Sequence, residues 1–124
     1  MNIIEIEDCP DYLAPDNAVA KEFLSPRNST PERLSITKMT IPPLTSVEKH
    51  YHMENEEACK IIDAEGNMLL GKKTRKVGPG GVVLNPPGNW HSVDNRSDQD
   101  LVMIVTVFGN GRLKIRLSNH KQSR

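Results

Sequence analysis

The sequence lacks three features that mark large classes of proteins. Its 124 residues carry 16 basic and 16 acidic side chains, so it has none of the positive excess that a nucleic-acid-binding protein shows. No apolar run approaches the roughly 20 residues that a membrane-spanning helix needs. The first residues, MNIIEIEDCPDY, have neither the basic nor the apolar segment of a signal peptide. We therefore expect a cytoplasmic protein that binds neither nucleic acid nor membranes.

Cysteine and aromatic residues are also scarce. Cys9 and Cys59 are the only cysteines, and two cysteines in a cytoplasmic chain are expected to stay reduced. Aromatic residues make up 4% of the chain, and Trp90 is its single tryptophan. Few side chains are therefore available to stack on a planar ligand.

Nine prolines and eight glycines divide the chain into short segments. The segments are rich in Ile, Val, Leu and Thr, and few of them keep a helical period. Many short strands at even spacing predict an all-β fold, either a sandwich or a barrel. We expect strands near residues 2–6, 18–24, 33–41, 46–52, 57–63, 67–70, 73–77, 82–84, 91–95, 101–108 and 112–117.

The length fits one domain over residues 1–124. We expect an N-terminal strand and arm over residues 1–32, a β core over residues 33–117 and a polar tail over residues 118–124. No linker or internal repeat divides the chain.

The stretch HYHMENEE at residues 50–57 contains two of the four histidines. On a strand, residues two apart point to the same face, so His50 and His52 are placed to share one metal ion. After a short turn, Glu57 can bring a carboxylate to the same ion. Glu56 is the alternative, because only one of two neighbouring side chains can face inward.

His91 follows a rigid corner, Pro86-Pro87-Gly88, and is placed to supply a ligand from a distant strand. Three imidazoles and one carboxylate suit one divalent ion of Fe, Mn, Zn, Ni or Cu. The predicted ligands are His50, His52, Glu57 and His91. Positions left open on such an ion favour a catalytic site over a purely structural one.

Two patterns in the sequence resemble the two motifs of the cupin family. The first motif is HxH, three or four residues, Glu, six residues and Gly, which His50, His52 and Glu57 fit. The second is Gly, five residues, Pro-x-Gly, two residues, His, three residues and Asn. All its fixed positions match, at Gly80, Pro86, Gly88, His91 and Asn95.

One position departs from the first motif, since Ala64 stands where glycine is expected. Alanine replaces glycine at low cost only where the backbone does not need a positive φ. The departure loosens the predicted hairpin and leaves the predicted ligands unchanged. With Glu56 as the ligand, the motif glycine would fall at Asp63, which fits worse.

The resemblance implies a double-stranded β-helix, a jelly-roll barrel of two packed antiparallel sheets. In such barrels a strand like 33–41 crosses the pocket, which makes Arg33, Thr37 and Met39 candidate substrate contacts. The period-two rule places Cys59 on the same face as Glu57. Trp90 either lines the pocket mouth or caps the core. Arg33 can anchor an anion or stay a surface charge, and Cys59 can be a redox group or an apolar filler.

The resemblance also implies enzymes of several classes, among which the fold does not choose. We rank a non-haem dioxygenase-type reaction on a small, oxygen-rich substrate first. The alternative is an isomerase, lyase, decarboxylase or cyclase that uses the metal as a Lewis acid, with Glu57 as general base. A non-catalytic small-molecule binding or sensor module is the second alternative. Small cupins commonly pair, and the apolar run Ile3-Ile4-Glu5-Ile6 needs a sheet edge to cover, so we expect a homodimer.

Overall fold

The computed structural model of the protein describes residues 3–14, 18–25, 33–52, 54–109, 115–117 and 122–123. One short 3₁₀ helix, η1 (Ile6–Asp8), lies near the start of this part of the chain. None of the helices in the described ranges is long and apolar enough to cross a membrane. The strands are β1 (Asp11–Leu13), β2 (Val19–Leu24), β3 (Leu34–Ile41), β4 (Thr45–Ser46), β5 (His50–His52), β6 (Glu56–Asp63), β7 (Gly66–Leu70), β8 (Lys73–Val77), β9 (Val82–Asn85), β10 (His91–Asn95), β11 (Leu101–Phe108), β12 (Ile115–Leu117) and β13 (Gln122–Ser123).

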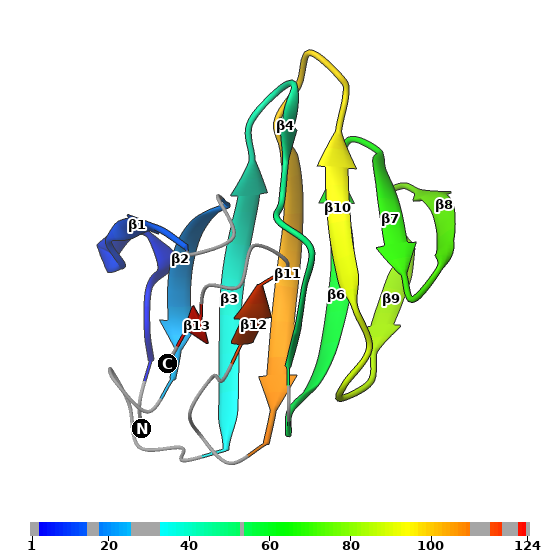
Figure 1. Cartoon of the computed structure of the whole chain (residues 1–124). Coiled ribbons are helices and arrows are strands. Elements are labelled where there is room, and N and C mark those ends of the chain that lie inside the picture. The colour runs from blue at the N-terminus through cyan, green and yellow to red at the C-terminus, as the bar shows by residue number, and fades with distance from the viewer. Residues whose placement is uncertain are drawn as a thin grey trace.

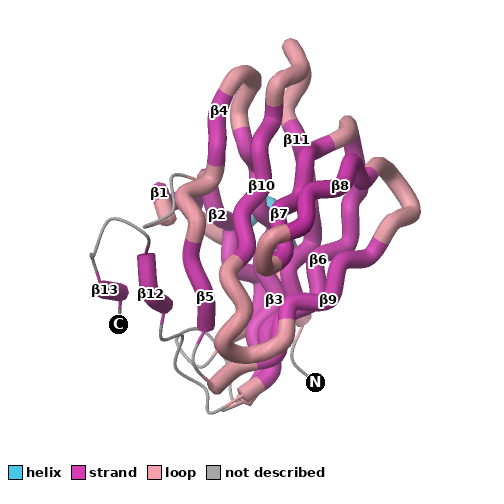
Figure 2. Tube along the Cα trace, turned by 45° about the vertical axis from the view of Figure 1, so that its right-hand side comes forward, coloured by secondary structure: helices cyan, strands magenta, loops and turns pink. Residues whose placement is uncertain are grey.

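The strands form two antiparallel sheets that pack face to face (Figures 1 and 2). The six-stranded sheet has the order β1-β2-β3-β11-β6-β9. The seven-stranded sheet has the order β13-β12-β5-β10-β7-β8, with β4 paired to β10. The predicted all-β fold with two packed antiparallel sheets is confirmed.

The core follows from the alternation of side chains along β3, β6 and β11. On β11, Leu101, Met103 and Val105 are buried while the residues between them are half-buried. Leu101 lies opposite Ile41 of β3, and Met103 lies opposite Ile61 of β6. These apolar side chains fill the space between the sheets, and their removal from water is the main force that holds the sheets together.

Asn95, the last residue of the second motif, fastens the far end of β10. Its side chain is fully buried, and its Nδ2 donates to the carbonyls of Ile41, Pro42 and Gln99 at 2.9, 3.1 and 2.8 Å. Its Oδ1 accepts from the backbone N–H and the hydroxyl of Ser97 at 3.1 and 2.8 Å. Asn95 therefore ties the turn that follows β10 to the end of β3.

The turn at Ala64 joins the two sheets, because β6 belongs to one and β7 to the other. Ala64 has a φ of 65°, in the left-handed region. The backbone at this point therefore does require the conformation that glycine adopts without cost. Alanine at this motif position therefore carries backbone strain. The sequence alone did not show whether φ is positive here.

The structure differs from the expected strands in three places. The predicted strand 2–6 is wrong over its described residues, since residues 3–5 are irregular and η1 begins at Ile6. The edge beside β2 is occupied by β1. The apolar run at residues 3–6 therefore has no strand partner in the described chain. The predicted strand 46–52 is divided into β4 and β5, and the short strand β13 lies within the expected polar tail, residues 118–124.

Candidate metal centre

Strands β5 and β10 bring two of the predicted ligands together. His50 and His91 lie directly opposite each other in the register of these strands. Their ring centroids are 4.2 Å apart with an interplanar angle of 66°. Both side chains are buried. Figure 2 shows β5 and β10 side by side in the front layer of the barrel.

Both histidines are oriented by a backbone carbonyl two residues earlier in the chain. His50 Nδ1 lies 2.6 Å from the carbonyl oxygen of Glu48, and His91 Nδ1 lies 3.1 Å from that of Asn89. A carbonyl oxygen only accepts, so each Nδ1 carries the proton and donates it. The lone pair of each neutral imidazole is then on Nε2. This is the tautomer with which a histidine ligates a metal while its other nitrogen is held by a hydrogen bond.

Glu57 approaches the histidines from the opposite sheet. Its carboxylate is buried, and Oε1 lies 3.5 Å from His91 Nε2. Glu56, the alternative ligand, is exposed at the start of β6. Of the two neighbouring acids, Glu57 is the one that faces the histidines.

Two further side chains hold the Glu57 carboxylate. The Cys59 thiol donates to Oε1 at 3.1 Å, and Asn85 Nδ2 donates to the same oxygen at 2.9 Å. Asn85 Nδ2 also lies 3.7 Å from Cys59 Sγ. No sequence pattern pointed to Asn85, although a polar residue at the end of the apolar run Val82-Val83-Leu84 was a visible signal.

The described residues fit a divalent metal ion but do not complete its ligand set. His52 lies on β5 opposite Ile115, and its side chain is outside what the structure describes. Within the described chain, no group of three or more His, Cys, Asp or Glu side chains is arranged as a full metal cluster. The fit rests on two imidazoles with anchored Nδ1 atoms and a buried carboxylate, which are ligand types that first-row transition metals accept.

The predicted substrate contacts lie at different distances from this centre. Thr37 shares a row of inward-facing residues with Val105 and Cys59, and Met39 lies beside Met103 in the next row and packs on the core. Arg33 is exposed beyond the start of β3, where its carbonyl accepts from Gly109. This is the end of the barrel at which β11 finishes, the lower end in Figure 1.

Trp90 is not brought toward the histidines. Its ring packs at 4.6 Å and 69° on Tyr51, with the Lys49 ammonium 5.4 Å from the ring centre. Tyr51 lies between His50 and His52 on β5, and neighbouring side chains on a strand point to opposite faces. Trp90, in the turn before β10, packs on Tyr51. The aromatic pair therefore covers the outside of the seven-stranded sheet.

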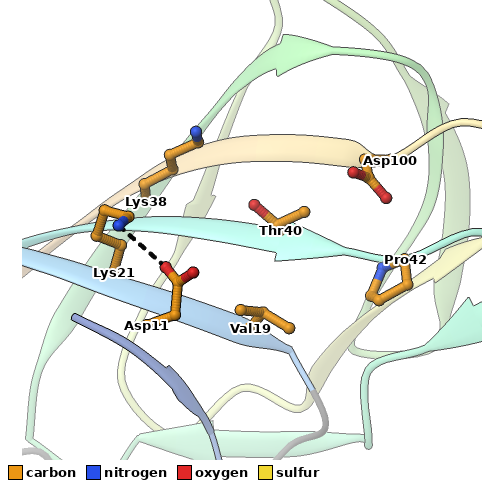
Figure 3. Close-up of a pocket in the computed structure, with 7 residues that line it drawn as sticks. All are labelled: Asp11, Val19, Lys21, Lys38, Thr40, Pro42 and Asp100. Carbon is orange, nitrogen blue, oxygen red and sulfur yellow. Dashed lines mark ion pairs between the residues drawn. The ribbon is translucent and has the colours of Figure 1, made fainter. Parts of the chain in front are cut away.

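A depression lies on the outer face of the six-stranded sheet (Figure 3). An ion pair between Lys21 and Asp11, 3.2 Å long, crosses it. Its lining consists of Asp11, Val19, Lys21, Lys38, Thr40, Pro42 and Asp100. None of the predicted site residues is among them.

Comparisons with known proteins place the fold. The sequence profile of the cupin domain matches residues 37–107. Among solved structures, the polyketide cyclase RemF from Streptomyces resistomycificus superposes with a TM-score of 0.80 at 18% identity, over 95% of this chain and 85% of that chain. A predicted oxalate decarboxylase from Thermotoga maritima gives 0.75 at 19% identity, over 87% and 99%.

A sugar phosphate isomerase of the cupin superfamily from Silicibacter pomeroyi gives a TM-score of 0.76 at 15% identity, over 95% of this chain and 82% of that chain. A search of curated protein sequences gave no match. The profile match covers more than half of the chain and includes both motifs and the described histidines. This protein belongs to the cupin family.

Proposed function

We propose that this protein is a metal-dependent cupin enzyme that acts on a small, oxygen-rich organic substrate. His50, His52, Glu57 and His91 would hold one divalent ion. The observation that supports this most strongly is the pair of buried histidines, each with its Nδ1 held by a backbone carbonyl, beside a buried carboxylate. His91 Nε2 and Glu57 Oε1 are 3.5 Å apart. A structural core alone does not require such a polar cluster.

The chemistry of the site divides between the ion and the polypeptide. A bound divalent ion supplies Lewis acidity toward a substrate oxygen. His50 and His91 hold their Nε2 atoms toward the centre of the barrel. Glu57 is also the catalytic candidate, because a buried carboxylate that is released from the ion could take a proton from the substrate and return it. Apolar neighbours such as Val105 and Met103 keep water from the interior.

Two reaction types remain candidates. The solved structures named above are a cyclase, an isomerase and a predicted decarboxylase, and none of these names implies transfer of an oxygen atom to the substrate. They favour a Lewis-acid reaction in which Glu57 moves a proton. The dioxygenase-type reaction expected from the sequence is therefore our second candidate.

Substrate contacts are proposed from their positions on the barrel. Thr37, Met39 and Cys59 share the inward face with Glu57, and Arg33 lies beyond them at the rim. We assign Arg33 to an anionic group of the substrate and the other three to its body. The position of Trp90 against Tyr51 leaves it a rim residue at most.

Metal content tests the proposal directly. Protein purified without added metal should carry a single divalent ion per chain, measured by elemental analysis. His50→Ala and His91→Ala should lose it. His120→Ala, which changes the one histidine outside the motifs, is the matched control and should keep it.

Reaction type can then be separated with small acids, diketones and phenols as substrates. Product formed under anaerobic conditions, followed by NMR, supports the Lewis-acid reaction, whereas substrate-dependent oxygen uptake supports the dioxygenase-type reaction. Ligand binding that needs no metal and is unchanged in His50→Ala would instead indicate a binding module and contradict the enzyme.

We also propose that two copies of the chain pair through the outer face of the six-stranded sheet. Four large apolar side chains on adjacent strands are between 46% and 63% exposed there: Ile62, Val82, Leu84 and Phe108. Exposed apolar patches of this kind mark interfaces. Glu56 and Lys60 flank Ala58 on the same face and are both exposed. A two-fold axis that lies in the interface, crosses β6 at right angles and passes near Ala58 would place each Glu56 opposite Lys60 of the second copy.

A further inference from the structure

Asn85 is a polar residue in a place where folding alone favours an apolar one. It ends β9 and is 1% exposed, among the most deeply buried side chains of the described chain. Asparagine is disfavoured in strands, and a buried amide costs free energy unless its groups are hydrogen-bonded. Across the described part of the structure, no donor reaches its Oδ1.

The orientation of the amide follows from its partners. The Glu57 carboxylate is an acceptor when ionised, so the atom facing Oε1 at 2.9 Å must be the donor Nδ2. Asn85 and Glu57 are directly opposite in the register of β9 and β6. The amide is therefore fixed across the strand pair, with one end on the carboxylate and the other on no group of the described polypeptide.

A residue kept for stability would be expected to satisfy both of its ends, as Asn95 does. Asn85 instead donates its hydrogen bond to the one carboxylate of the candidate metal centre. Cys59 reaches the same oxygen from the same strand as Glu57. Two donors from two directions restrict the rotation of the carboxylate about its final bond.

We propose that Asn85 is a positioning residue that holds the Glu57 carboxylate in the orientation needed to bind the metal ion. This rests on the proposed function, since it assumes that Glu57 is a ligand. Partners that orient metal ligands typically change metal affinity by about 10- to 100-fold when they are replaced. Asn85 acts through Glu57 and touches neither the ion nor the substrate in this scheme.

A double-mutant cycle on metal affinity tests the inference. Metal-stripped protein is titrated with Co²⁺ alone, and the dissociation constant is taken from competition with a fluorescent chelator and from the visible absorption of bound cobalt. Asn85→Leu keeps the branched shape and removes the donor. It should weaken binding by about 10- to 100-fold and alter the cobalt spectrum.

In the Glu57→Ala background the same Asn85 substitution should change affinity very little, because its target is gone. Asn67→Leu replaces a half-buried asparagine of β7 and should leave affinity unchanged. Asn85→Ala is run in parallel, since a smaller side chain folds where leucine does not fit. Circular dichroism checks that each variant is folded.

The outcomes are distinct. Equal losses with and without Glu57, or wild-type affinity in both Asn85 variants, would overturn the inference and leave the proposed function standing. A wild-type protein that binds no cobalt at a defined stoichiometry would overturn the proposed function and this inference with it.

Discussion

At the scale of single residues, the left-handed backbone of Ala64 lowers the stability of the folded chain at a motif position. A left-handed backbone costs an L-residue about 1–2 kcal/mol, and part of this is recovered by alanine because glycine loses more entropy on folding. Ala64→Gly should therefore raise the free energy of unfolding by about 1 kcal/mol, measured by urea denaturation.

The control for Ala64→Gly is Ala58→Gly on the same strand, β6. Ala58 is not among the described residues with positive φ, so glycine there should lower stability by roughly 0.5–1 kcal/mol. If both substitutions lowered stability, the strain assigned to Ala64 would be absent.

Asp94 on β10 gives stability a pH dependence. The hydroxyl of Ser46 donates to Asp94 Oδ1 at 2.6 Å, and this bond, followed by the bond from Arg96, lowers the pKa of the carboxyl. A carboxyl whose pKa is lowered on folding adds stability above its unfolded pKa, about 3.9. That contribution is lost as the pH falls through the lower folded value.

Ser46→Ala removes the larger cause of the shift and should raise the pKa of Asp94. The variant should be less stable than the parent at neutral pH, and the pH-dependent part of the difference should vanish once Asp94 is protonated in both. Urea unfolding from pH 2 to pH 7 follows this, and NMR titration of the Asp94 carboxyl gives the pKa directly. An unchanged pKa would refute the assignment.

At the scale of strands, the side-chain amide of Asn95 supplies the hydrogen bonds that hold the end of β10 to the neighbouring turn and strand. Replacing it with alanine leaves the carbonyls of Ile41, Pro42 and Gln99 without that donor. We expect Asn95→Ala to lower the free energy of unfolding by about 3 kcal/mol, at roughly 1–3 kcal/mol for each group left unsatisfied. Asn67→Ala, on the neighbouring strand β7, should cost much less in the same urea experiment.

Regular strands could be predicted because their signal is local. The expected strands 73–77, 91–95 and 101–108 coincide with β8, β10 and β11. The run 2–6 has a good local pattern as well, but a strand also needs a partner, and β1 occupies the available edge. Availability of an edge is a property of the whole sheet and cannot be seen in the run itself.

The same distinction applies to the candidate site. The two motifs predicted that His50 and His91 would supply ligands to one ion, and the pairing of β5 with β10 places the two residues opposite each other. Asn85 could not be predicted, because its hydrogen bond reaches Glu57 across 28 positions through the pairing of β6 with β9. The contact of Trp90 with Tyr51 could not be predicted either. Trp90 lies in the turn before β10, where no strand alternation fixes the direction of its side chain.

At the scale of the whole molecule, the proposed pairing would bury the exposed apolar side chains on the outer face of the six-stranded sheet. A dimer that uses this face should separate when Leu84, 57% exposed, is replaced by lysine, because the charge would be buried in the interface. Light scattering should report a dimer for the parent protein and a monomer for Leu84→Lys at micromolar concentration.

Leu44→Lys is the matched control for Leu84→Lys, since Leu44 is 81% exposed but lies in the turn between β3 and β4, outside that face. It should remain dimeric. A monomeric parent protein at the same concentration would contradict the proposed pairing.

His50 and His91 belong to one sheet and Glu57 to the other. An ion held by all three would act as a cross-link between the two layers of the barrel, closing a loop of chain between Glu57 and His91. Saturating metal should then raise the free energy of unfolding with its concentration, by about 2.7 kcal/mol at 100 times the dissociation constant. Amide hydrogen exchange should slow together in β5, β6 and β10. The contact between the two sheets at the metal centre would then be the most protected part of their interface.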